Sequence, residues 1–189
     1  MPTAEFLESF RHAHWRVYRQ VPNQVLAAPW RHWVLAPGSL TKRLILASDG
    51  DFRVQVRQQH WARPWPSEQR ALGLAPGQLA LIREVALIGQ GEVWVEARTV
   101  IPATTLRGPR RRLANLGTTP LGAYLFKCSS MRRGPLQIAA RPAGRDNLAP
   151  AWGRRSLFYL AERPLLVSEF FLPALLPHER GSLAPPRQR

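Results

Sequence analysis

Apolar and polar positions follow a helical pattern near the N-terminus and a strand pattern through most of the remaining chain. In residues 3–20 the apolar side chains recur three or four positions apart, as they do on one face of an amphipathic helix. Ser39 is suited to cap a second helix at residues 40–47. The pattern therefore predicts a helix in each of these two segments.

Strict alternation of apolar and polar residues begins at Phe52 and is typical of a strand with one face in solvent. Residues 81–88 and 93–101 are more apolar, and the short glycine-containing turn between them predicts a β-hairpin. Residues 60–78 are rich in Pro and Trp, and we expect a long loop with one helical turn there. Further strands are expected at residues 136–140, 156–160 and 165–172.

Proline and glycine mark the turns in the second half of the chain. Thr119 is suited to cap a short helix that begins at Pro120, a residue favoured at the first helical position, and that we expect to end at Phe126. Residues 141–151 are rich in Pro, Gly and Asn and predict a loop. Helices first, then about six mostly antiparallel strands with helical excursions between them, indicate an α+β fold.

Length and composition fit one domain with a short tail. The chain has 189 residues and 45% hydrophobic residues, which is enough to bury a core. After Pro177 the sequence is polar, basic and rich in proline. We therefore expect residues 1–176 to form the domain and residues 177–189 to be a disordered basic tail.

Several classes of protein and of site are disfavoured. No apolar run reaches the ~18–20 residues that a membrane span needs, so no transmembrane segment is expected. Cys128 is the sole cysteine, which excludes an internal disulfide and suits a reducing, cytoplasmic location. The histidines have no metal-site spacing beyond a weak pair at His12 and His14, so no metal site is expected.

The net charge of +15 invites a nucleic-acid interpretation. Nearly all of the cations are arginines, because Lys42 and Lys127 are the only lysines. These arginines are spread along the chain and form no DNA- or RNA-binding signature. We therefore expect no specific nucleic-acid partner, although the charge is compatible with a small dianionic substrate.

Two of the apolar strands each carry a charged residue in the middle. Arg83 lies within residues 81–88, on a strand face that is otherwise aliphatic. A buried guanidinium is costly unless an anion meets it. Glu169 lies within residues 165–172. The simplest interpretation pairs the two residues, whereas the alternative is a pocket in which Arg83 binds a carboxylate of a ligand and Glu169 a hydroxyl.

Four segments of the chain occur in an order that together forms a specific signal. They are residues 39–43 (Ser-Leu-Thr-Lys-Arg); residues 83–85 with the strand that ends at 97–102; residues 116–126; and residues 152–156 followed by 164–173. Over about residues 28–175 the chain resembles the chorismate pyruvate-lyase family.

The resemblance implies that chorismate is converted to 4-hydroxybenzoate and pyruvate, the first committed step of bacterial ubiquinone synthesis, without a metal or an organic cofactor. It implies a six-stranded antiparallel sheet with helices on one side and helical flaps over an internal pocket. Arg83 and Glu169 are the implied catalytic residues, with Arg83 on a carboxylate and Glu169 on the ring hydroxyl. The backbone at Leu121 would contact the ligand carboxylate, and Leu40 would lie against the ring. We expect a monomer whose partners are chorismate and 4-hydroxybenzoate.

The chain departs from the family at a few positions. Leu40 stands where the family can have Met, so only the apolar character carries over, and Glu96 stands where a small residue can occur. The loop at residues 141–151 looks longer than the family's.

Two questions stay open at this level. Glu169 can act as a general base or can only position the hydroxyl, because the hydrogen can also pass internally to the enolpyruvyl group. The same fold serves in some transcription regulators as an effector-binding domain, so a non-catalytic ligand-binding domain is the alternative function. Those regulators carry a winged-helix domain ahead of the fold, for which the N-terminal segment here is expected to be too short.

Overall fold

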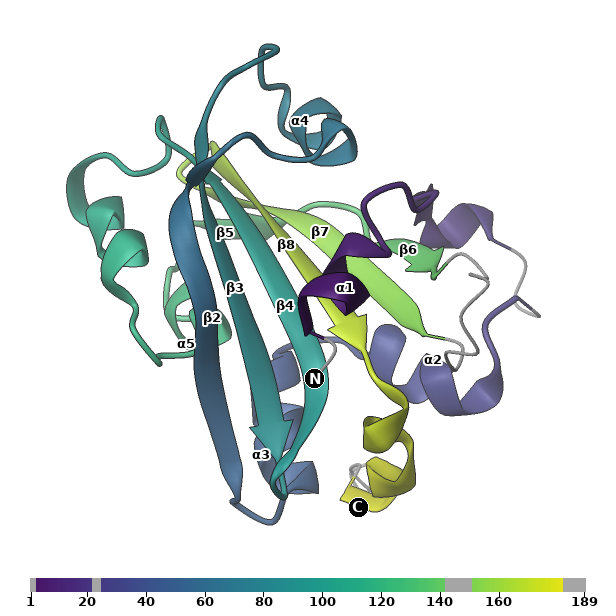
Figure 1. Cartoon of the computed structure of the whole chain (residues 1–189). Coiled ribbons are helices and arrows are strands. Elements are labelled where there is room, and N and C mark those ends of the chain that lie inside the picture. Colours follow the sequence, from purple (N-terminus) through teal and green to yellow (C-terminus); the bar gives the residue numbers. More distant parts are fainter. Residues whose placement is uncertain (1–2, 22–24, 142–150, 182–189) are drawn as a thin grey trace, which may run out of the picture.

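Residues 3–21, 25–141 and 151–181 are described by the computed structural model, in which helices lie against one twisted antiparallel sheet (Figure 1). The sheet has eight strands. They are β1 (Arg16–Val17), β2 (Phe52–Ala62), β3 (Ala80–Gly89), β4 (Glu92–Pro102), β5 (Met131–Arg133), β6 (Gln137–Ala140), β7 (Trp152–Leu160) and β8 (Arg163–Phe171). The α+β class predicted from the pattern is confirmed.

The strand order is β1-β6-β7-β8-β4-β3-β2, and β5 also pairs with β7. The β3–β4 hairpin therefore lies beside β8, which brings two distant apolar stretches of the sequence together. The expected number of six strands is wrong, because β1 and β5 add two short ones. Segments of two or three residues are too short to show alternation, and they are strands here because their backbones pair with β6 and β7.

Five α-helices and three 3-10 helices complete the described chain. They are α1 (Thr3–Glu8), α2 (Ala28–Val34), α3 (Leu40–Ala47), α4 (Pro66–Leu72), α5 (Leu121–Leu125), η1 (Tyr18–Gln20), η2 (Gly108–Asn115) and η3 (Pro173–Gly181). Helix α3 has the predicted bounds, and the side chain of Ser39 accepts a hydrogen bond from the backbone N–H of Lys42 at 3.4 Å. The capping prediction is therefore confirmed.

The helix expected at residues 3–20 is wrong beyond Glu8, where α1 ends. Residues 16–17 instead join the edge of the sheet as β1, because their backbone groups pair with β6. The apolar stripe is nevertheless core, since Phe6 and Phe10 are buried and the ring of Phe10 lies 4.5 Å from that of Phe170. Helical spacing identified the buried residues but not the backbone conformation that presents them.

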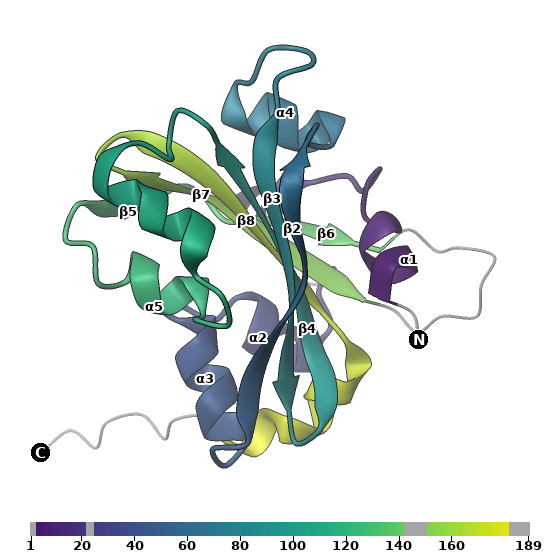
Figure 2. The same ribbon diagram turned by 60° about the vertical axis from the view of Figure 1, so that its left-hand side comes forward.

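Helices cover both faces of the sheet (Figure 2). We call the face that carries Val85 and Val167 the front face, and it packs against α2, α3 and α5. The back face carries Ile82, Val100 and Phe170, and it packs against α1 and α4. The expectation of helices on one side is therefore wrong. The reason is that β3 is buried at every position, so both of its faces need cover.

Two connections differ from the expected loops. Strand β2 continues to Ala62, so the expected loop at residues 60–78 begins later, and its helical turn is α4. Gly73 ends α4 in the left-handed conformation (φ 65°), which favours glycine. Helix α5 has Pro120 at its N-cap and no side-chain cap, so the predicted capping role of Thr119 is wrong.

The 3-10 helix η3 contacts the sheet through His178. The ring of His178 in η3 lies 4.5 Å from the indole of Trp94, so the expected boundary at residue 177 falls inside η3. The rest of the expected tail, residues 182–189, and the expected loop at 142–150 lie outside the described residues. Within the described ranges, no helix is both long and apolar enough to cross a membrane.

Candidate active site

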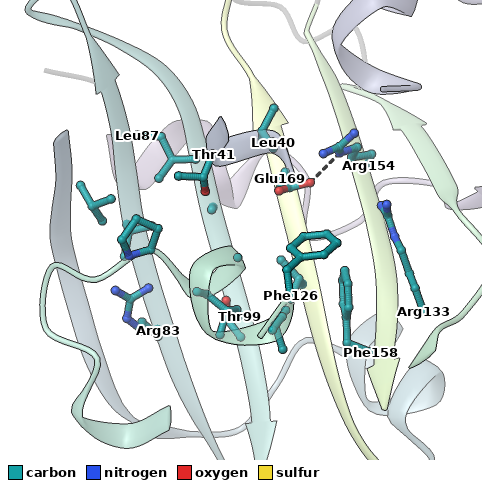
Figure 3. Close-up of a pocket in the computed structure, with 18 of the residues that line it drawn as sticks. Leu40, Thr41, Arg83, Leu87, Thr99, Phe126, Arg133, Arg154, Phe158 and Glu169 are labelled. Atoms are coloured by element: carbon teal, nitrogen blue, oxygen red, sulfur yellow. Dashed lines mark hydrogen bonds and ion pairs between the residues drawn. The ribbon is translucent and has the colours of Figure 1, made fainter. Parts of the chain in front are cut away.

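A pocket lies between the front face of the sheet and helices α3 and α5 (Figure 3). Its volume is about 60 Å³, several times the roughly 10–15 Å³ of accessible space that one water molecule requires. Strands β2, β3, β4, β5, β7 and β8 all contribute side chains. The strands contribute the apolar side chains of Val85, Ala97 and Val167 to the lining. A small ligand with an apolar body and a few polar groups fits such a surface.

Arg83 enters this pocket from β3 and is 2% exposed. Its Nη2 donates to the backbone carbonyl of Gly117 at 2.8 Å and more weakly to that of Thr119 at 3.4 Å. Its Nε is buried without an acceptor, and no carboxylate of the described residues is within ion-pair distance. Burial lowers the pKa of Arg83, because it disfavours the charged form and no carboxylate of the described residues offsets this cost. The guanidinium thus has donor capacity left for an anion.

Glu169 reaches the same pocket from β8, and its partner is Arg154 rather than Arg83. The Nε of Arg154 donates to Oε2 of Glu169 at 2.5 Å, with the two side chains 1% and 18% exposed. The simplest interpretation of the sequence, an Arg83–Glu169 pair, is therefore wrong. No second donor to Glu169 appears among the described side chains, so one carboxylate oxygen is left for a ligand.

Arg154 also binds the end of helix α2. Its Nη1 donates to three backbone carbonyls at 3.0–3.3 Å, those of Trp33, Val34 and Ala36. Carbonyls at a helix C-terminus lack partners inside the helix and carry partial negative charge, so a guanidinium suits them. The side chain thereby fixes both Glu169 and the segment that leads into α3.

Leu40 and Leu121 lie in the pocket lining, as the resemblance implies. Each is the first residue of its helix, α3 or α5, and both are buried. The two helices approach closely above the pocket, because a Cβ added at Gly122 would lie 3.3 Å from Oγ1 of Thr41. All four site residues expected from the sequence are thus brought to one place.

Sequence reasoning missed two further charged residues of the pocket, Arg133 and Arg154. Arg154 lies in the Gly-Arg-Arg-Ser segment, where alternation places one arginine on each face of β7. That alternation could have identified it. Arg133 ends a three-residue strand, and its neighbours in sequence gave no sign that it would be half-buried.

The charged residues of the pocket are three arginines, Arg83, Arg133 and Arg154, and one acid, Glu169. Fully ionised, they leave a net charge of +2 in the lining. Such a lining favours a ligand with two negative charges.

Other charged residues are buried on the back face and do not reach the pocket. Arg98 bonds both Glu84 and Glu68, with its Nε 2.8 Å from Oε1 of Glu68. Glu96 is fully buried, neither of its oxygens has a hydrogen-bond partner, and Arg57 lies 3.5 Å away. Burial, with a smaller contribution from Glu84, raises the pKa of Glu96 to about 7, while Arg57 opposes the shift.

Comparison with known proteins finds a matching protein family. A family model described as chorismate lyase matches residues 10–180. A probable chorismate pyruvate-lyase of Methylococcus capsulatus is 48% identical over 153 residues, which cover 76% of this chain and 94% of that protein. A chorismate pyruvate-lyase of Salmonella arizonae is 42% identical over 146 residues, covering 76% of this chain and 82% of that protein.

Solved structures with a similar fold include a domain of a repressor and the protein PhnF. The C-terminal domain of the histidine utilization repressor of Pseudomonas syringae has a TM-score of 0.54 at 12% identity, covering 73% of this chain and 99% of that one. PhnF of Mycobacterium smegmatis has a TM-score of 0.53 at 16% identity, covering 74% and 66%. At such identities the likeness concerns the fold alone.

Proposed function

The chain belongs to the chorismate lyase family, and we propose that it converts chorismate to 4-hydroxybenzoate and pyruvate in the pocket beneath α3 and α5. Chorismate carries one carboxylate on a cyclohexadiene ring, one on an enolpyruvyl ether, and a ring hydroxyl. The net charge of +2 in the lining matches these two carboxylates.

The observation that carries the proposal is the state of Arg83. Arg83 is a nearly fully buried cation, and its Nε–H has no hydrogen-bond acceptor among the described residues. We propose that Arg83 binds the ring carboxylate and that the first backbone N–H groups of α5, at Leu121, share it, since such groups have no acceptor inside a helix. The apolar side chain of Leu40 would lie against the ring.

The reaction requires that the substrate be oriented and that water be excluded, more than that the substrate be chemically activated. The bond between the ring and the ether oxygen breaks, and the hydrogen on the hydroxyl-bearing carbon leaves, so that the ring becomes aromatic. The enolpyruvyl group gains a hydrogen and leaves as pyruvate. No metal or organic cofactor takes part in this proposal. The protein would contribute a fixed cation and a water-poor pocket in which that cation acts strongly.

We propose that Glu169 holds the ring hydroxyl. Arg154 bonds one of its oxygens, which leaves the other to accept a hydrogen bond from the substrate. A carboxylate fixed in this way suits positioning, and an internal transfer of the hydrogen to the enolpyruvyl group would need no base. The competing role, general base, predicts a much larger effect of removing the carboxylate.

The alternative function is a non-catalytic effector-binding domain, which the shared fold makes reasonable. The family match and the identity of up to 48% over most of a curated relative favour the enzyme. Mixing the protein with chorismate and a chelator, then measuring 4-hydroxybenzoate and pyruvate, separates the two. Formation of both products in equal amounts is expected, whereas binding of chorismate without either product would support the effector domain.

Three wider expectations stay predictions. Supply of 4-hydroxybenzoate for ubiquinone can be tested by deleting the gene and asking whether added 4-hydroxybenzoate restores ubiquinone. Cell fractionation tests the cytoplasmic location, and light scattering on the purified protein tests the monomeric state.

A further inference from the structure

We propose that Arg133 binds the second carboxylate of the substrate, the one on the enolpyruvyl group, and so determines specificity for the dianion over the product. The inference rests on the proposed function, because it concerns the same pocket. It places on β5 a residue that binds the enolpyruvyl carboxylate, a role that none of the site residues expected from the sequence has.

Arg133 is half-buried in the pocket lining and has spare donors. Its Nε donates to Oγ of Ser156 at 3.1 Å, and its guanidinium carbon lies 5.3 Å from the centre of the Phe158 ring. No ion pair joins Arg133 to an acid of the described residues. The two terminal nitrogens of the fork therefore have no protein acceptor in that part of the chain.

The surroundings of Arg133 are on balance unfavourable to its charge. Burial is the largest cause that lowers the pKa of Arg133, the charge of Arg154 lowers it further, and Glu169 partly offsets both. Glu169 is already bonded to Arg154. A cation held here without its own anion is a site where a carboxylate from a ligand would be stabilised.

The position of Arg133 suits the second carboxylate rather than the first. In Figure 3 Arg83 and Arg133 lie on opposite sides of the pocket, with Glu169 and Phe126 between them. Chorismate also carries its two carboxylates at separate ends, one on the ring and one on the ether side chain. With the ring carboxylate on Arg83 and the hydroxyl on Glu169, the side chain would extend toward Arg133.

The neighbouring residue provides a matched control. Arg132 lies on the same strand but is exposed, forms an ion pair with Glu162 at 3.0 Å, and stacks on Tyr159. It shares the strand and the charge of Arg133 but not the pocket. A substitution at Arg132 thus controls for the loss of one positive charge from the protein.

The experiment compares Arg133→Gln, Arg133→Lys and Arg132→Gln with the unchanged protein. The quantities measured are kcat/KM for chorismate, the Kd of 4-hydroxybenzoate and the melting temperature. The product lacks the enolpyruvyl carboxylate, so it should not sense Arg133. We expect Arg133→Gln to lower kcat/KM by about 10- to 100-fold, as for loss of a charge-assisted hydrogen bond, and to change the product Kd by less than about 3-fold. Arg133→Lys should recover part of the loss, and Arg132→Gln should leave both values unchanged.

Other outcomes are distinguishable. If the unchanged protein forms neither product, the proposed function fails and the inference fails with it. The unchanged protein can instead be active while the folded Arg133→Gln variant behaves otherwise than expected. If this variant changes kcat/KM for chorismate and the Kd of 4-hydroxybenzoate equally, or changes neither, only the inference is overturned. A purely structural role through Ser156 and Phe158 would lower the melting temperature of both Arg133 variants without separating substrate from product.

Discussion

Arg154 on β7 and Glu169 on β8 are direct partners in the antiparallel ladder, and their side chains form an ion pair on the front face. Both residues line the pocket, and Nη1 of Arg154 donates to carbonyls at the end of helix α2. Glu169, which we propose to bind the substrate hydroxyl, is therefore fixed by an arginine that is itself bonded to helix α2.

Removing one member of the Arg154–Glu169 pair should lower the stability of the fold. We expect Arg154→Met to destabilise the fold by about 3–5 kcal/mol, because Glu169 would remain as a poorly compensated charge and three carbonyls would lose their donor. Urea unfolding measures the change. The exposed pair of Arg132 and Glu162 is the comparison, and Arg132→Gln should cost no more than ~1 kcal/mol. Equal costs at the two sites would contradict the structural role of Arg154.

Arg83 should matter to substrate and product alike, because both carry the ring carboxylate. We expect Arg83→Gln to weaken the binding of chorismate and of 4-hydroxybenzoate by ~2–4 kcal/mol each. Titration with 4-hydroxybenzoate and steady-state kinetics provide the two values. A variant that is folded and binds 4-hydroxybenzoate like the unchanged protein would remove Arg83 from the site.

Glu169→Gln tests the role of the carboxylate, since the amide retains an acceptor oxygen and the shape. For a positioning role we expect kcat to fall by about 10-fold and 4-hydroxybenzoate to bind more weakly, because a charge-assisted hydrogen bond becomes a neutral one. A fall in kcat of ~10²-fold or more with unchanged product affinity would instead indicate a general base.

Glu96 should make stability depend on pH. Its pKa rises from the usual 4.5 to about 7 in the folded state, so the folded protein binds more protons than the unfolded chain between these values. Stability should therefore fall as the pH rises from about 4.5 to about 7, and should change no further above that through this group. At 1.36 kcal/mol per pH unit, the fall from this one residue is on the order of 3 kcal/mol at most.

Glu96→Gln removes the titration, and urea unfolding at pH 5 and pH 8 isolates it. We expect the variant to gain stability relative to the unchanged protein on going from pH 5 to pH 8. Any cost of the buried amide itself is the same at both pH values and cancels in this difference. A constant offset between the two proteins would show that Glu96 does not titrate in this range.

Much of the fold could be predicted because it depends on local chemistry. Alternation identified the strand that begins at Phe52, apolar runs bounded by turn residues identified the other five of the six longer strands, and Ser39 identified the start of α3. A charged residue inside an apolar strand identified Arg83 and Glu169, since burial of such a residue demands a partner wherever the strand lies. The resemblance of ordered segments then gave the family, which the comparisons support.

The identity of each partner could not be predicted in this way. Periodicity tells which face a side chain occupies, but strand order and register decide what it meets there. The sequence left Arg83 and Glu169 as a possible pair, whereas the β7–β8 ladder places Arg154 opposite Glu169. Arg83, two strands away on β3, instead faces the carbonyls that precede α5. Arg133 enters the pocket only because a three-residue strand pairs with β7, a contact between segments that no local pattern encodes.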